Sequence, residues 1–124
     1  MDAAGLCVFL AARYLLDHNP TLWPTRLANM LNQVTGAGYT EESLLLVGER
    51  IYNLERLFLL KAGFSRADDS LPKRMLTEPL PDGPGKGQTV ELNRMLPEYY
   101  QLRGWDEHGI PKAEKLEQLG LKPL

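Results

Sequence analysis

The residues of this chain that could do chemistry lie at its start, in the run Asp2-Ala3-Ala4-Gly5-Leu6-Cys7. The run places an acid and the only cysteine of the sequence beside an apolar segment. A thiolate is a strong ligand for iron and zinc, whereas a cysteine buried among apolar side chains is commonly inert. Both interpretations of Cys7 stay open at this point, because the other ligands of a metal site must come from elsewhere.

Other catalytic and phosphate-binding motifs are missing from the sequence, including H-E-x-x-H, C-x-x-C and the nucleophile elbow. Lys86 lies between two glycines but lacks the spacing of a phosphate-binding loop. The acid pairs Glu41-Glu42 and Asp68-Asp69 are sequence neighbours, which point to different sides of a helix. We therefore assign both pairs to helix capping or solvated loops. We interpret His18 as a helix-end residue and His108 as a solvated turn residue.

Composition predicts a soluble globular protein with neither a nucleic acid nor a membrane as its partner. The 124 residues carry 14 basic and 16 acidic side chains, so no positive excess is available to neutralise phosphates. No apolar stretch approaches the roughly 18 residues needed to cross a bilayer. A single cysteine cannot form an internal disulfide and no secretory signal begins the chain, which predicts a cytoplasmic protein. The abrupt apolar start suggests a segment of a larger protein.

Hydrophobic periodicity predicts an all-α fold, a subdomain of about four to six helices, because no period-two alternation occurs. The first helix is apolar nearly all round, so a chain of this size cannot cover it alone. A coil rich in proline and glycine separates the second half of the chain from the first. The expected helices are 6–16, 24–34, 41–62, 90–103 and 112–119, with a coil over 65–90 that includes a helical patch at 72–77.

The helix over 41–62 carries the strongest signals. Thr40 is its predicted N-cap, and two acids follow in the first turn, where the helix dipole favours them. Its predicted core-facing stripe consists of Leu44, Val47, Ile51, Leu54 and Phe58, and Leu45, Leu57 and Leu60 widen this stripe into a broad buried face. In the helix over 90–103, Pro97 predicts a kink or a division into two short helices. We expect Trp105 to fold back onto the helices after the turn at Gly104.

The order of residues over 48–121 resembles the C-terminal domain of the aldehyde:ferredoxin oxidoreductases, a family of tungsten-pterin enzymes. The opening run is similar to the D-x-x-G-L-C segment of the same family. The matching stretches are 48–58, 61–64, 71–74, 78–81, 83–84, 86–87, 95–96, 98–100, 102–106, 109–111, 115–116 and 119–121. Matches in order across most of the chain are more specific than any single short motif.

The resemblance implies roles for three residues of the opening run. Cys7 corresponds to the fourth ligand of a [4Fe-4S] cluster, and Asp2 and Leu6 correspond to residues that contact a pterin of the tungsten bis-pterin cofactor (a molybdopterin). The physical chemistry agrees, because a cluster iron requires a thiolate and a carboxylate accepts hydrogen bonds from pterin N–H groups. The other cluster cysteines of the family, in a C-x2-C-x3-C arrangement, and its N-terminal cofactor-binding domain are absent from this sequence.

The resemblance further implies that residues 1–124 are the C-terminal helical portion of an enzyme that oxidises aldehydes to carboxylic acids. Electrons would pass through the iron-sulfur cluster to ferredoxin, and the N-terminal domains would be partners of this segment. Alone, the chain is expected to be inactive and to bind no cofactor. The alternative is a stand-alone helical fragment with a structural or interaction role, which would self-associate through an exposed apolar face.

Overall fold

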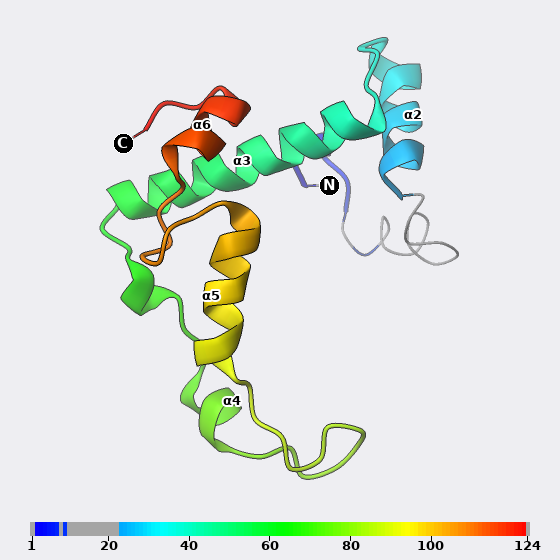
Figure 1. The fold of residues 1–124 in the computed structure, drawn as a ribbon. Coiled ribbons are helices and arrows are strands. Elements are labelled where there is room, and N and C mark those ends of the chain that lie inside the picture. Colours follow the sequence, from blue (N-terminus) through cyan, green and yellow to red (C-terminus); the bar gives the residue numbers. More distant parts are fainter. Residues whose placement is uncertain (1, 8, 10–22, 124) are drawn as a thin grey trace. The chain divides into compact units, whose positions relative to one another are not determined.

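The structure of the chain is a computed structural model that describes residues 2–7, 9 and 23–123. Within these ranges it contains five α-helices, two short 3-10 turns and no β-strand, which confirms the predicted all-α class (Figure 1). The elements are η1 (Asp2–Ala4), α2 (Trp23–Thr35), α3 (Glu41–Lys61), η3 (Arg66–Asp68), α4 (Lys73–Thr77), α5 (Leu92–Arg103) and α6 (Ala113–Leu119). The helix predicted over 6–16 lies largely outside the described residues, and so does His18.

The chain divides into two compact units, residues 1–49 and 50–124. The core of the first unit is centred on Leu27 of α2, which is buried. The side chains packed against it are those of Leu6, Trp23, Leu31 and Leu44. Helix α2 buries Leu27 and packs Leu31 against it, whereas Met30 and Val34, at the same three-four spacing, are 48% and 86% exposed, so only part of the apolar face that its sequence pattern predicts is used. Through Leu6 the opening run of the chain joins this core.

The start of α3 is fixed by side-chain hydrogen bonds to the backbone. The Thr40 hydroxyl accepts from the Ser43 amide at 3.1 Å, and the Ser43 hydroxyl accepts from the Thr40 amide at 2.9 Å. This reciprocal pair satisfies amides that the first turn of a helix leaves free. Asn32 secures the preceding turn by bonding both backbone groups of Tyr39, at 2.6 and 2.8 Å. The predicted cap at Thr40 is therefore confirmed.

The buried face of α3 differs from the predicted apolar stripe. Its buried residues are Asn53, Arg56 and Leu57, whereas Leu54 and Phe58 are 54% and 71% exposed. Burial of the two polar side chains is possible because neighbouring segments supply partners: the Trp105 indole donates to Asn53, and Arg56 donates to a backbone carbonyl. The predicted burial is confirmed for Leu57 and was wrong for Leu54 and Phe58, because the hydrogen bonds of Asn53 and Arg56 turn the helix face that carries these two polar residues inward.

Helices α5 and α6 of the second unit end as their glycines predict. Gly104 and Gly120 close the helices with φ values of 70° and 63°, in the left-handed region that favours glycine. After Gly104 the chain turns back, and the Trp105 amide donates to the Tyr100 carbonyl at 2.8 Å. Pro97 lies inside one continuous twelve-residue helix, so of the two predicted alternatives, a kink or a division into two short helices, the division does not occur.

The proline- and glycine-rich segment over 65–90 is ordered by turns and isolated hydrogen bonds. Its regular structure consists of η3 and α4 alone within the described residues. Between them and α5, the Leu80 amide donates to the Gln88 carbonyl at 3.0 Å and the Val90 amide to the Met75 carbonyl at 3.0 Å. These bonds close the segment into a loop between α4 and α5 (Figure 1), as the coil prediction implies.

We predict that Gly109→Ala strongly destabilises the second unit. Gly109 has φ of +73°, and a Cβ there would lie 2.9 Å from the Tyr100 ring and closer still to the Arg56 guanidinium. Left-handed strain and overpacking each cost about 1–3 kcal/mol, so the loss should be about 3 kcal/mol. The free energy of unfolding from urea titration measures it.

Gly120→Ala is the matched control for this change. Its φ is +63°, but no atom lies within 4 Å of the added Cβ, so it carries the strain without the clash. It should cost about 1 kcal/mol. Equal losses for the two variants would show that the packing around Gly109 is not tight.

Candidate functional site

The three residues predicted to contact cofactors lie at the start of the first unit. Asp2 begins η1, and Gly5 follows with φ of +71°, a backbone angle that favours glycine. Leu6 is half-buried and packs against Leu27, whereas Cys7 is exposed. The chain therefore turns at Gly5, is anchored by Leu6 and presents the Cys7 thiol at the surface.

An exposed thiol fits one position of an iron-sulfur cluster but does not make a complete site. Within residues 2–7, 9 and 23–123, no three His, Cys, Asp or Glu side chains lie close enough together to hold a metal ion. A [4Fe-4S] cluster is held by about four thiolates, and the sequence has one cysteine. Cys7 can thus be one ligand, and the remaining thiolates have to come from residues outside this sequence.

A polar network in the second unit surrounds the buried Arg56 of α3. Its guanidinium donates to both carboxylate oxygens of Asp69, at 2.7 and 2.6 Å, and to the Gly109 carbonyl at 2.8 Å. The Arg56 side chain is 7% exposed and the Asp69 side chain 22%. Tyr100 of α5 donates its phenolic hydrogen to the same carboxylate. The network thereby ties α3, the loop after η3, α5 and the turn at Gly109 together.

Burial and hydrogen bonding act in opposite directions on the charge of Asp69. Burial alone would raise the pKa of this carboxyl group, but the hydrogen bonds from Arg56 and Tyr100 outweigh burial and hold the pKa below its usual range. Burial, followed by the hydrogen bond to Asp69, raises the pKa of Tyr100 to about 12. Asp69 is therefore an anion near neutral pH whose oxygens already accept hydrogen bonds from Arg56 and Tyr100, so it is poorly placed as a general base toward a bound substrate.

Four aromatic rings pack together beside this network, and we call them the aromatic cluster: Tyr52, Tyr99, Tyr100 and Trp105. Trp105 lies at its centre, 4% exposed, with its indole N–H donating to Asn53 at 2.8 Å. The Tyr52 ring stacks on Trp105 with centroids 6.0 Å apart, and the Tyr99 and Tyr100 centroids each lie 5.8 Å from it. The predicted return of Trp105 onto the helices is confirmed.

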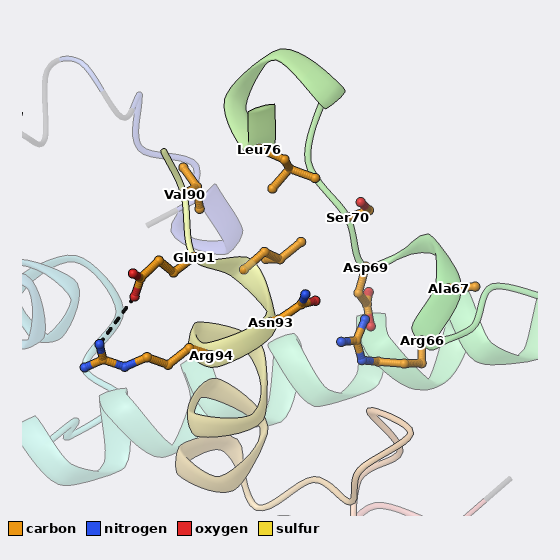
Figure 2. A pocket seen from close by; sticks show the side chains of 10 residues that line it. Arg66, Ala67, Asp69, Ser70, Leu76, Val90, Glu91, Asn93 and Arg94 are labelled. Carbon is orange, nitrogen blue, oxygen red and sulfur yellow. Dashed lines mark hydrogen bonds and ion pairs between the residues drawn. The ribbon is translucent and has the colours of Figure 1, made fainter. Parts of the chain in front are cut away.

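A surface pocket of about 470 Å³ adjoins the network in the second unit (Figure 2). Side chains from η3 and the loop after it, from α4 and from the first turn of α5 line it. Its acids are paired, since Asp69 binds Arg56 and Glu91 binds Arg94 at 3.3 Å. The pocket lining contains no nucleophile with an adjacent base, so this arrangement does not support covalent or acid-base catalysis by itself.

The acid pair Asp68-Asp69 has two different roles, of which the sequence predicted the role of Asp68 and not the ion pair of Asp69. Asp68 accepts from the Ser65 amide at 2.8 Å in a capping box, which confirms helix capping. The Asp69 backbone closes η3 as its C-cap, but the Asp69 side chain is not a solvated loop group, because it forms the ion pair with Arg56. The only local signal was that the Ser65-x-x-Asp68 pattern uses the first acid and leaves the second available. His108 is exposed in its turn, as predicted.

Comparison with known proteins places this arrangement in an enzyme family. The family described as "Aldehyde ferredoxin oxidoreductase, domains 2 & 3" matches residues 1–121. The chain belongs to the aldehyde ferredoxin oxidoreductase family. It is 52% identical over 122 residues to the tungsten-containing aldehyde ferredoxin oxidoreductase of Pyrococcus furiosus, covering 98% of this chain. The corresponding enzyme of Thermococcus kodakarensis is 48% identical over 122 residues, again over 98% of the chain.

A further relative of this chain carries a different name. The aliphatic sulfonate oxidoreductase, WOR-like subunit, of Pyrococcus furiosus is 41% identical over 99 residues, which cover 73% of this chain and 16% of that protein. The chain spans 19% of the length of the two tungsten-containing relatives. None of the helices in the described ranges is long and apolar enough to cross a lipid bilayer.

We predict that Asp69→Asn destabilises this segment of the family at neutral pH and not in acid. The variant leaves the Arg56 charge buried without its anion, which costs about 2–4 kcal/mol. Because the pKa of Asp69 is lowered in the folded state, its stabilisation is present above the ordinary pKa of about 3.9 and is lost as the pH falls below it.

Urea unfolding of both proteins at a series of pH values measures this effect. The difference in unfolding free energy should be full near pH 7 and should shrink below about pH 4. Glu107→Gln is the control, because the Glu107 side chain is 87% exposed and lies 3.6 Å from the exposed His108 ring. A pH-independent loss for Asp69→Asn would contradict the ion-pair interpretation.

Proposed function

We propose that this chain is the C-terminal part of a tungsten-dependent aldehyde ferredoxin oxidoreductase and that it contributes Cys7 as a cluster ligand. The observation that carries the proposal is the exposed Cys7 thiol, held directly after the core anchor Leu6 in a family member. An anchored but accessible thiolate is what a shared cluster requires, because its other ligands approach from a different part of the enzyme.

Asp2 and Leu6 contribute the pterin contacts in this proposal. A carboxylate at Asp2 accepts hydrogen bonds from pterin N–H groups. Leu6 has a different role, because its side chain packs against Leu27 and is occupied by the core of the first unit. Its backbone, following the turn at Gly5, is therefore the part of Leu6 that meets the pterin. Gly5 supplies the positive φ that this turn requires.

When bound, the tungsten-pterin group would supply the two-electron oxidation of an aldehyde to a carboxylic acid, and the cluster would pass the electrons to ferredoxin. The role of this chain is to hold one ligand and to form part of the wall that excludes water. Relatives sharing this segment are named for aldehydes and for sulfonates. We therefore assign substrate selection to domains of the enzyme outside this segment.

We also place the enzyme in the cytoplasm, where a lone cysteine stays reduced.

The second candidate function is that of a helical module that associates through apolar contacts and has no redox role. The observation that favours it is the exposure of large apolar side chains in the second unit, with Phe58 71% and Leu102 85% exposed. Exposed apolar surface promotes association. Sedimentation of the isolated chain distinguishes the two: a concentration-independent monomer argues against the module.

We predict that Cys7→Ser in the complete oxidoreductase lowers the iron content and the broad visible absorbance of the cluster. A serine hydroxyl at this position does not provide the thiolate ligand that the fourth iron needs. Iron analysis and absorption spectra after anaerobic purification measure the loss, and tungsten content is determined on the same samples.

Ala3→Ser is the matched control, because it introduces the same side chain at an exposed neighbouring position. It should leave iron, tungsten and absorbance unchanged. If Cys7→Ser retains the full iron content and spectrum, Cys7 is not a cluster ligand. If the isolated chain binds iron and tungsten stoichiometrically, the helical-module alternative is wrong.

A further inference from the structure

The aromatic cluster contains four side chains that can each lose one electron, packed within a short distance of one another. Trp105 lies 5.8–6.0 Å from the centroid of each tyrosine ring, and the Tyr99 and Tyr100 centroids are 6.3 Å apart. We propose that this cluster is a one-electron relay, in which an oxidising equivalent on Trp105 passes to Tyr100 while the phenolic proton of Tyr100 passes to Asp69.

The surroundings of Trp105 disfavour an oxidised indole. Its N–H donates to the side-chain oxygen of Asn53, an amide that is not basic enough to take the proton. The Arg56 guanidinium carbon lies 5.0 Å from the ring centroid, and a nearby cation opposes the positive charge of an indole radical. An oxidised Trp105 therefore does not lose its proton readily, and it draws an electron from an adjacent ring that has a proton acceptor.

Tyr100 is the ring best prepared to give that electron. Its phenol donates to the carboxylate of Asp69, and an oxidised phenol is a strong acid, so its proton moves to the acceptor even though the pKa of Asp69 is lowered. The product is a neutral tyrosyl radical, which avoids an additional buried charge. Arg66 lies farther away, 5.7 Å from the ring centroid. The Asp69 carboxylate, which accepts the phenolic proton, therefore makes Tyr100 easier to oxidise than a phenol without such an acceptor.

Tyr52 and Tyr99 are poorer end points of the relay. Their hydroxyl groups are 2.5 Å apart and bond each other, so neither has a carboxylate as its proton acceptor among the described hydrogen bonds. The Arg103 guanidinium lies 4.0 Å from the Tyr52 centroid and donates to the Tyr99 hydroxyl at 3.1 Å, which opposes the loss of an electron. Tyr52, 39% exposed, instead connects the cluster to solvent.

Each electron and proton in the relay has a stated origin and destination. A one-electron oxidant, such as an oxygen-derived radical, takes one electron from Trp105, and Trp105 recovers one from Tyr100. The phenolic proton of Tyr100 moves to Asp69, which becomes neutral. A thiol reductant in solution then returns one electron by way of Tyr52, and Asp69 returns the proton to Tyr100. The relay would spread oxidising equivalents across the cluster instead of leaving them on the buried indole.

Laser photoionisation of tryptophan tests the relay, because light removes an electron from the indole wherever it is buried. The chain has two tryptophans, so Trp23→Phe is used as the parent and leaves Trp105 as the only source. Transient absorption should show the visible tryptophan-radical band decaying as the sharp near-ultraviolet tyrosyl band rises at the same rate. In D2O the transfer should slow several-fold, because a proton moves with the electron.

Tyr100→Phe in the same parent should prolong the Trp105 radical several-fold and reduce the tyrosyl signal, whereas Tyr39→Phe, outside the cluster, should change neither. Circular dichroism and thermal unfolding establish that each variant is folded. The isotope effect needs only the parent, so the test stands even if Tyr100→Phe fails to fold. The proposal is overturned if no tyrosyl band grows in the parent, if D2O has no effect, or if a folded Tyr100→Phe variant behaves like Tyr39→Phe.

Discussion

The second unit depends on the burial of one positive charge, the guanidinium of Arg56. Removing a charge from water is costly unless the charge is paired and hydrogen-bonded, so acceptors from several segments surround the guanidinium. Asp69 approaches from the loop after η3, and the Gly109 carbonyl approaches from the turn between α5 and α6. Tyr100 then completes the contacts of Asp69. The hydrogen bonds that satisfy Arg56 therefore tie four segments of the second unit together.

The same constraint explains why the apolar side of α3 faces outward. A helix has one direction in which Asn53 and Arg56 can reach Trp105 and Gly109, and Leu54 and Phe58 then point away from those partners. Exposed apolar surface of this kind favours contact with another protein surface. The exposure is thus a consequence of internal packing and is not a defect of the unit.

Local signals made much of the fold predictable. The Thr40 cap, the glycines that end α5 and α6, and the helical spacing between them each act within a few residues. The contacts that select the buried face of α3 act over 52 and 53 residues, from Asn53 to Trp105 and from Arg56 to Gly109. Periodicity carries no information about such partners, so the sequence predicted the helix and not its orientation. The roles of Asp2, Leu6 and Cys7 came from the family resemblance and stay predictions.

The proposed metal ligand and the aromatic cluster are held in different ways. The anchor at Leu6 and the turn at Gly5 leave the Cys7 thiol exposed. In the aromatic cluster Trp105 and Tyr100 are buried, and the phenols of Tyr52, Tyr99 and Tyr100 each have a hydrogen-bond partner. A ligand shared with another domain must remain open until that domain is in place, whereas a relay works only when its rings and proton acceptor are already fixed. The exposure of Cys7 and the close packing of the rings therefore suit the different roles that we propose for them.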